Sequence, residues 1–438
     1  MLVENASTMF SICVLVALIA RPLYIACHAR KSKQDSVNAV SPVDCRLIIE
    51  AKKLPNGQNY LQNKLNPPQS RALPNHPRLP AVFGIENAFT SDDERYVRGF
   101  VSRASGLVNL KTGDWEGLVV MLRRAVQQSL GQSEQGSKIH LMSLVQALTM
   151  RMVLRVLFRM DEEEVLDIPD EYLIDLASAI NNAWIRSKKA DCHDDEDGTK
   201  VPRFEENQHL QSCLAAIFPH MTIGPGEHNP LNLILPGFET MWRVVLRAFI
   251  EIRYTTGLEH PEWKRMLVAF AEIPTKAQFI QQSPENGNVS AEMLITESLR
   301  LYPPTRRIHR AFSFHPSSPS PNEFEIHSAN IEASHTAPQI WGPTALTLDP
   351  SRWTKDRLTN EQRNAFFPFG ARPFVCPAQG VFGPRVIGLL VGVLFGEEGA
   401  EWLLDGGGDG VGGEGLRAGK RLSNGRDAYG GLVLVKRG

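Results

Sequence analysis

The sequence has little of several features that would assign a function directly. Its 438 residues carry a formal net charge of −1, so charge gives no indication of nucleic acid or of acidic partners. No internal repeat is evident. The six cysteines form no Cys-x-x-Cys pair and show no zinc-finger or disulfide-framework spacing: Cys13, Cys27, Cys45, Cys192, Cys213 and Cys376. Five of them are interpreted as ordinary thiols in a reducing compartment, in a chain whose hydrophobic content of 42% supports a sizeable core.

Long hydrophobic runs are also scarce, and the candidate for a membrane segment lies at the N-terminus. The run begins at Met9, and it extends from Ala20 to Cys27 only by including Arg21. Positive charge follows the run instead of preceding it, which is the reverse of a cleaved signal peptide. This order predicts a signal anchor over residues 1–29, with the rest of the chain in the cytoplasm. A helix lying at the membrane surface is the alternative.

The remainder divides into two parts by composition. Residues 30–90 are rich in proline, asparagine and glutamine, and we expect a surface linker with little regular structure that leads into the catalytic domain. Residues 91–438 are expected to form that domain. Apolar residues recur at helical spacing between Asp92 and Phe158 and between Tyr172 and Trp184, and a short strand pair is expected near Val435. The pattern predicts a mainly helical protein with small β-sheets.

A loop rich in aromatic residues and proline, from Phe366 to Gln379, leads into an apolar segment with helical spacing. Pro377 suits the first position of a helix, which would place Cys376 at its N-cap. There the amides of the first turn and the helix dipole are expected to lower the pKa of the thiol and favour the thiolate, the form that binds metals. The alternative is a cysteine that merely packs.

This loop resembles the haem-binding loop of the cytochrome P-450 family, Phe-Gly-x-Gly-x-Arg-x-Cys-x-Gly. Phe369, Gly370 and Cys376 match it at the family's spacing. Three positions depart from the pattern: Arg372 replaces a glycine, Phe374 replaces the arginine, and Ala378 replaces the last glycine. The resemblance implies that Cys376 is the thiolate ligand of haem iron.

A second resemblance concerns a structural motif of the same family. Glu297 and Arg300 share one face of a helix predicted over Ala291–Leu301, where they can pair. Followed by Leu301-Tyr302-Pro303-Pro304, they resemble the family's K-helix. Arg352 lies in a segment, Asp349-Pro350-Ser351-Arg352-Trp353, that resembles the family's partner for this pair. The resemblance implies a buried triad of Glu297, Arg300 and Arg352 that holds the haem loop in place.

A third resemblance is to the oxygen-binding part of the family's long I-helix. Gly237, Glu239 and Thr240 stand where the family has a small residue and an acid–alcohol pair. A hydroxyl beside a carboxylate can relay protons from water, and a glycine leaves room for dioxygen. Pro230 and Pro236 predict that this helix is shortened or kinked.

The haem propionates require cationic partners. By resemblance Arg310, thirteen residues after Glu297, lies beside one propionate. We expect Arg372 to replace the arginine lost at Phe374. The family's Trp-x-x-x-Arg pattern is absent at Trp115, so Arg123 or Arg124 is a further candidate. His309 and His335 are interpreted as structural histidines.

Together the motifs cover the chain in the family's order from about Leu231 to Leu434, and they imply a haem-thiolate monooxygenase with haem b, most like microsomal fungal members. It would insert one oxygen atom into a small apolar substrate, in secondary metabolism, on the endoplasmic reticulum membrane as a single-pass protein. No reductase domain is evident, so electrons would come from NADPH–cytochrome P-450 reductase.

Two alternatives remain open. The altered loop, and two regions that are shorter than the family pattern, suggest a non-catalytic or truncated relative with impaired haem binding. A haem-thiolate isomerase or dehydratase would need no reductase.

Overall fold

The computed structural model describes residues 38–436, except for 57–58, 77, 132–135, 190–200, 315–323, 398–401, 406–415 and 417–418. The anchor expected over residues 1–29 therefore lies outside the described residues. Within the described part, none of the helices has the length and apolar character needed to cross a bilayer.

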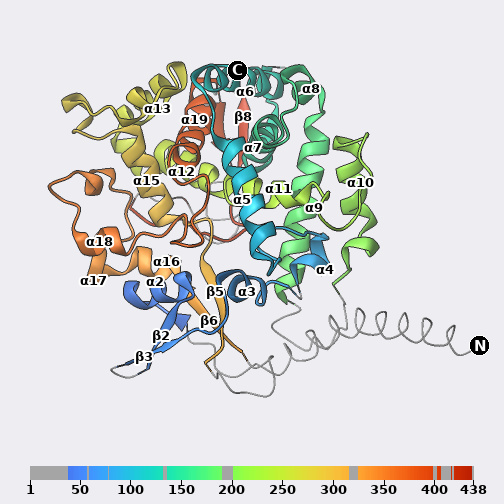
Figure 1. Cartoon of the computed structure of the whole chain (residues 1–438). Helices are drawn as coiled ribbons and strands as arrows, with labels where there is room; N and C mark the ends of the chain where they lie inside the picture. The colour runs from blue at the N-terminus through green and yellow to red at the C-terminus, as the bar shows by residue number, and fades with distance from the viewer. Residues whose placement is uncertain are drawn as a thin grey trace, which may run out of the picture.

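Helices make up most of the molecule (Figure 1). The longer ones are α2 (Pro42–Glu50), α5 (Glu94–Val108), α6 (Thr112–Gly131), α7 (Leu141–Leu157), α9 (Asp170–Lys189), α10 (Gln208–Ile217), α11 (Leu231–Phe238), α12 (Trp242–Tyr254), α13 (Pro261–Glu272), α15 (Ala291–Leu301) and α19 (Phe382–Glu397). The shorter ones are α3 (Pro67–Ala72), α4 (Leu79–Phe83), α8 (Glu162–Asp167), α14 (Lys276–Ile280), α16 (Ile331–Thr336), α17 (Pro338–Trp341) and α18 (Asn360–Asn364). The helical segments predicted between residues 92 and 184 are confirmed, and α15 has its predicted bounds.

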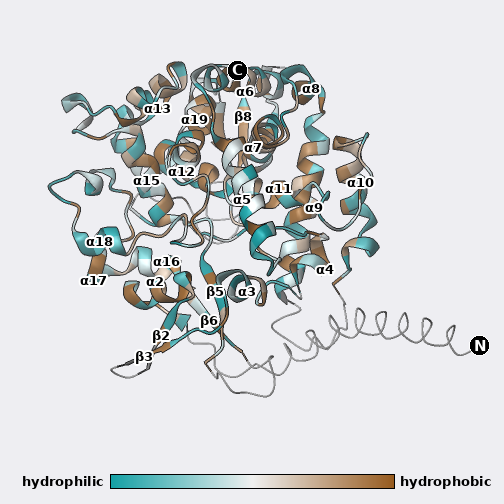
Figure 2. Cartoon of the chain, in the orientation of Figure 1, coloured by the Kyte–Doolittle hydropathy of each residue, from teal (hydrophilic) through white to brown (hydrophobic). Residues whose placement is uncertain are grey.

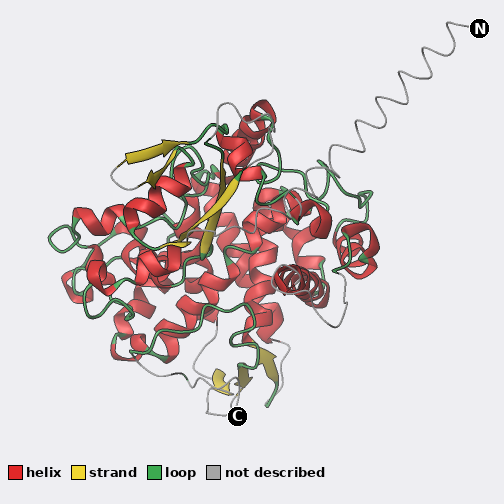
Figure 3. Ribbon diagram, turned by 90° about the horizontal axis from the view of Figure 1, so that it is seen from below, coloured by secondary structure: helices red, strands yellow, loops and turns green. Residues whose placement is uncertain are grey.

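The strands form three small sheets, drawn in yellow in Figure 3. In the first, β6 (Glu325–Asn330) lies between β1 (Asn38–Ala39), which is parallel to it, and the antiparallel β5 (Arg307–Phe312). The second is a hairpin of β2 (Lys53–Asn56) and β3 (Asn59–Gln62). In the third, β8 (Val433–Lys436) pairs with β4 (Lys138–His140) and β7 (Trp402–Asp405). The mainly helical class with small sheets, including the expected C-terminal strand pair, is confirmed.

The expected linker over residues 30–90 is wrong for the part that is described, because α2, α3, α4 and three strands occupy it. Several of its prolines stand at the starts of these helices instead of interrupting them. Ser41 caps α2 and is followed by Pro42, and Asn66 forms a capping box before Pro67 of α3. Proline fits the first turn of a helix because its missing N–H would be unpaired there. The proline-rich composition therefore predicted a loop in a segment where prolines stand at the starts of helices.

Helix α19 lies in the interior and is apolar on nearly all sides, as Figure 2 shows. Such a helix is stable only when other elements cover its whole circumference. Gly392 allows α13 to approach closely, because a Cβ atom built there would lie 2.3 Å from the carbonyl oxygen of Leu267. The backbone contact between these helices therefore depends on the missing side chain.

Gly392→Ala is expected to force α13 and α19 apart and to lower the free energy of unfolding by about 1–3 kcal/mol, the usual cost of overpacking. Gly396→Ala is the matched control on the same helix, because no atom lies within 4 Å of its Cβ position. It should be neutral or stabilising by up to about 1 kcal/mol, since alanine is the better helix former. Urea unfolding measures the free energy of unfolding of both variants. Equal effects would contradict the inference that Gly392 allows the close contact between α13 and α19.

Candidate functional site

The loop before α19 folds back on itself and holds Cys376 at a fixed place. Gly370 has φ 75°, and a Cβ atom there would lie 3.1 Å from the carbonyl oxygen of Phe374. The Cys376 amide donates to the carbonyl oxygen of Phe369 at 3.0 Å. The ring of Phe369 lies against Gly383, in the first turn of α19, where a Cβ atom would be 2.9 Å from it. Glycine is therefore required at residue 370, and the loop is fastened to α19.

The expected N-cap position of Cys376 is wrong. Helix α19 begins at Phe382, and residues 377–381 form turns before it. The Ala378 amide still points at the thiol and lowers its pKa, but burial has the larger effect and raises the pKa of Cys376 above its usual value. The side chain reaches solvent, yet the surrounding protein removes much of its hydration. A thiolate at Cys376 therefore needs a cation bound to the sulfur.

The carboxylate of Glu297 is completely buried and is surrounded by donors. Arg300 donates to both of its oxygens, at 2.8 and 2.7 Å, and Arg352 donates to one of them at 3.3 Å. The Trp353 indole N–H (2.9 Å) and the Asp349 amide (3.2 Å) also donate to it. The structure thus brings the three residues of the expected triad together, with both arginines buried.

His335 connects this triad to the loop. One ring nitrogen lies 3.2 Å from the carbonyl oxygen of Arg300, and the other accepts the Phe367 amide proton at 2.8 Å. Burial and the charge of Arg300 lower the pKa of His335 to about 3, so the ring stays neutral and can accept that proton. The sequence analysis interpreted His335 as structural but did not foresee that it carries the contact from α15 to the cysteine loop.

Glu297→Gln is expected to destabilise the fold by about 3–5 kcal/mol, because it leaves the buried Arg300 without its counter-charge and takes the nearer of two acids from the buried Arg352. Glu292→Gln is the matched control, since Glu292 is exposed on the same helix and should change stability by less than about 0.5 kcal/mol. Thermal and urea unfolding measure the difference. Similar small effects in both variants would show that the triad does not hold the fold.

The predicted oxygen-binding segment lies where α11 ends and α12 begins. Thr240 donates its hydroxyl to the carbonyl oxygen of Pro236 at 2.7 Å. Glu239 pairs instead with Arg426, and its other carboxylate oxygen is buried without a hydrogen bond. Glu239 and Thr240 are neighbours in sequence, but among the described contacts no hydrogen bond joins their side chains.

Gly237 has a role different from the expected one. A Cβ atom built on Gly237 would lie 2.7 Å from a methyl carbon of Leu157 on α7 and 3.4 Å from one of Val153. The space that its missing side chain leaves is therefore filled by α7. The break between the two helices agrees with the expected interruption of this segment by proline, since Pro236 lies inside α11.

Two buried arginines flank Phe374, two residues before Cys376. The guanidinium carbons of Arg310 and Arg71 lie 4.3 and 5.0 Å from the centre of its ring. Burial, together with the neighbouring Arg71 charge, lowers the pKa of Arg310 to about 9, and burial lowers that of Arg71 to about 10. The Nε atoms of both are buried without a hydrogen-bond partner, and neither pairs with an acid among the described residues. Two buried positive charges without a nearby acid favour the binding of an anion beside them.

The other candidate arginines lie elsewhere. Arg372 is exposed. Arg124 pairs with Glu162 and Glu163, and Arg123 lies 3.8 Å from Glu397. Acids on neighbouring elements lie beside both side chains, and a role of Arg123 or Arg124 at the cysteine site stays a prediction. Sequence reasoning missed Arg71 because nothing in its segment, Pro67–Ala72, marks it as part of a site.

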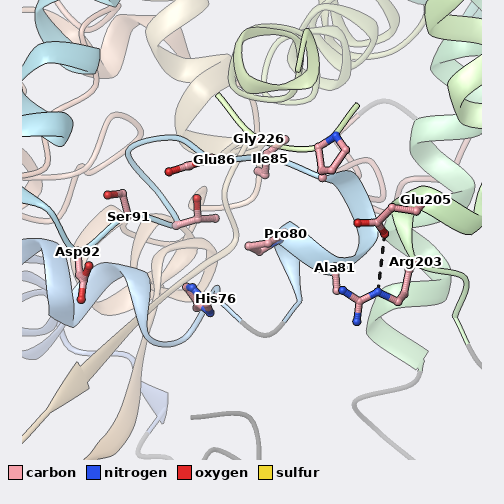
Figure 4. Close-up of a pocket in the computed structure, with 13 residues that line it drawn as sticks. His76, Pro80, Ala81, Ile85, Glu86, Ser91, Asp92, Arg203, Glu205 and Gly226 are labelled. Atoms are coloured by element: carbon pink, nitrogen blue, oxygen red, sulfur yellow. Dashed lines mark ion pairs between the residues drawn. The ribbon is translucent and has the colours of Figure 1, made fainter. Parts of the chain in front are cut away.

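A cavity of about 510 Å³ opens between α4 and the segment near Arg203 (Figure 4). Its lining includes His76, Asp92 and Arg203, and Arg203 pairs with Glu205 at 3.7 Å between the nitrogen and oxygen. None of the predicted site residues lines it. It is a surface recess lined by both polar and apolar residues, and no residue of the cysteine loop lines it.

The chain matches no family model, but segments of it resemble curated proteins. CYP749A22 of Panax ginseng, a cytochrome P-450, is 33% identical over 108 residues, which is 22% of this chain and 20% of the relative. Benzoate 4-monooxygenase of Aspergillus niger is 43% identical over 61 residues, 14% of this chain and 12% of that enzyme. The matched segments thus span a fifth or less of these relatives.

The fold is similar to that of a solved structure over nearly the whole chain. CYP175A1 from Thermus thermophilus superposes with a TM-score of 0.52 at 14% identity, covering 91% of this chain and 88% of that one. The identity is too low to transfer a function, and the likeness establishes the arrangement of helices and sheets.

Proposed function

We propose that this chain, which belongs to the cytochrome P-450 superfamily, is a haem-thiolate monooxygenase. The observation that supports this best is the pair of buried arginines, Arg71 and Arg310, close to Cys376. A haem carries an iron that a thiolate can ligate and two propionates that such cations can neutralise. The residues present therefore fit the group that the cysteine loop was expected to hold.

Each part of the site has a distinct task in this proposal. The Cys376 sulfur holds the iron, Phe369 and Gly370 shape the loop that presents it, and Arg71 and Arg310 hold the propionates. When bound, the haem supplies the activation of dioxygen. Thr240 and Glu239 hold protons on the other side of the site, with Glu239 restrained by Arg426. The Glu297 triad acts only by fixing the loop.

The partners follow from the proposed reaction. A monooxygenase needs two electrons from outside this chain, and we assign them to NADPH–cytochrome P-450 reductase on the endoplasmic reticulum membrane. Among the relatives, one name specifies an aromatic acid as substrate, benzoate 4-monooxygenase. We assign to this chain an oxygen insertion into a small apolar organic substrate, in secondary metabolism.

A second candidate is the non-catalytic relative. The ion pair between Glu239 and Arg426 favours it, because a carboxylate held by a guanidinium is a weaker proton acceptor. In that case the protein would bind haem without turning over, or would not bind it at all.

The reduced, carbon-monoxide difference spectrum tests the proposal. Wild-type protein is expected to show the Soret band of a thiolate-ligated haem, and Cys376→Ser should abolish it because the hydroxyl is a poor iron ligand. Cys213→Ser is the matched control, a buried free cysteine that should keep the band. Soluble, folded wild-type protein without the band would contradict haem binding, and the band without NADPH-dependent turnover would favour the non-catalytic relative.

Arg71→Met is expected to have two opposite effects. Without the contact between Arg71 and a propionate, haem should dissociate at least about tenfold faster, the loss expected for a charge-assisted hydrogen bond. The free energy of unfolding of the haem-depleted protein should instead rise by about 1 kcal/mol, because an unpaired buried charge is removed. Haem transfer to apomyoglobin and thermal unfolding measure the two. Arg372→Met, on the exposed loop position, should change neither, and the reverse result would assign the propionate to Arg372.

A further inference from the structure

A second cavity, of about 210 Å³, lies between α5 and the chain around the start of α11. Four apolar or aromatic residues of α5 line it at helical spacing: Tyr96, Phe100, Ala104 and Leu107. The opposite wall includes Met221, which precedes α11, and Leu233 on α11 itself. No residue of the cysteine loop lines this cavity.

Helix α5 is held at its two ends and is poorly covered between them. Near its start Tyr96 donates its hydroxyl to the carbonyl oxygen of Glu86 at 2.7 Å. At its end Arg159 donates to the carbonyl oxygen of Leu107 at 3.0 Å. Among the fifteen residues of α5, Val97 alone is buried. A ligand in the cavity would remove the apolar face of this helix from water, which is favourable.

The amide side chains in the cavity wall already have hydrogen-bond partners within the protein. Asn232 donates to the carbonyl oxygens of Gly226 and Glu227 at 2.8 and 3.0 Å. Asn229 donates to that of Phe83 at 3.1 Å. Within the described chain, no residue of the wall has a buried side-chain nitrogen or oxygen without a partner. The wall therefore has no polar atom that a ligand must satisfy, and it favours an uncharged, apolar ligand.

The charged residues of the cavity lie at its rim. Arg103 and Glu227 are both exposed, and their charged groups lie 4.0 Å apart. An exposed pair of this kind contributes little to stability, so it is a weak barrier to entry, and its two charges select neither a cation nor an anion. Met221 is 39% exposed beside this rim. Its flexible, polarisable side chain can adapt to the shape of a ligand.

The volume and the rings of the wall define the ligand further. An apolar cavity of about 150 Å³ binds benzene, so about 210 Å³ has room for one aromatic ring with a small substituent. Tyr96, Phe100 and Phe158 contribute rings to the wall, and Phe158 is held by Phe218 at 4.9 Å between ring centres. Aromatic rings pack favourably against one another in offset or edge-to-face arrangements. A small aromatic molecule therefore fits this wall best.

We propose that the cavity between α5 and α11 binds a small, uncharged aromatic molecule. This goes beyond the proposed function, because no step of the argument depends on haem or on Cys376. The bound molecule joins the poorly covered middle of α5 to α11. It therefore stabilises α5 when the site is filled, since a ligand that binds only the folded state stabilises that state.

Nuclear magnetic resonance of the full-length protein, with ¹³C in the methionine methyl groups, tests the proposal with toluene as the probe. The ring current of a bound aromatic molecule displaces the signal of a methyl group beside it. The Met221 signal, identified by Met221→Leu, should therefore shift to a limit as toluene is added. The signal of Met266, which is buried on α13 and does not line the cavity, should stay in place. Benzoate should need at least about tenfold higher concentration, because its carboxylate must leave water.

Two variants fill the cavity from opposite sides. Ala104→Leu should raise the toluene concentration that gives half of the Met221 shift at least about tenfold. Leu233→Phe makes the same test from α11 if Ala104→Leu does not fold. Ser102→Leu is the matched control, because it adds a leucine to an exposed position of α5 that does not line the cavity. It should leave the toluene titration unchanged.

Three outcomes overturn the proposal: the Met221 signal does not shift, benzoate binds as tightly as toluene, or Ser102→Leu weakens toluene binding as much as Ala104→Leu. The methionine signals report binding whether or not the carbon-monoxide spectrum shows a thiolate. A missing spectrum with a saturable Met221 shift would therefore reject the haem proposal and keep this site, and the reverse result would reject this site alone.

Discussion

The buried carboxylate of Glu297 is the constraint on which the rest of the structure depends. An ionised carboxylate in the interior is tolerated only when donors and opposite charges surround it, and here two arginines, an indole and a backbone amide do so. Arg300 lies on α15 itself, and the other three donors come from one segment, residues 349–353. The hydrogen bonds to this one carboxylate therefore fix the relative positions of these segments. His335, which contacts both the Arg300 carbonyl oxygen and the Phe367 amide, connects them to the cysteine loop. The position of Cys376 is the end of this chain of contacts.

The sequence predicted what depends on local pattern and missed what depends on distant partners. Periodicity gave the bounds of α15 correctly, because its cap Ser290 and the residues after Leu301 mark both ends. Composition failed for residues 38–90, where several of the prolines stand at helix starts. The thiol environment of Cys376 was wrong because residues 377–381 separate it from the start of α19, and Gly237 faces α7 because the register of α11 turns it that way. Arg71 and Arg426 carry no local signature, and only the folded chain brings them to the site.

Two groups of buried charge illustrate one physical rule with two different outcomes. Around Glu297 the protein supplies the counter-charges itself, which makes the group a structural one. At Phe374 two arginines lie beside the cysteine loop without an acid among the described residues. The degree of internal compensation thus separates a structural ion cluster from a ligand site, which the burial of the residues alone does not do.

The ion pair between Glu239 and Arg426 has a consequence for chemistry at Glu239. One oxygen of that carboxylate is paired with Arg426 and the other is buried without a donor, so the group is held in place but incompletely satisfied. A guanidinium close by favours the ionised form and makes the acid reluctant to take up a proton. Any anion that competes for Arg426 weakens this effect and raises the affinity of Glu239 for a proton. The pair thus acts against proton uptake at Glu239, and this is the physical basis of the non-catalytic alternative.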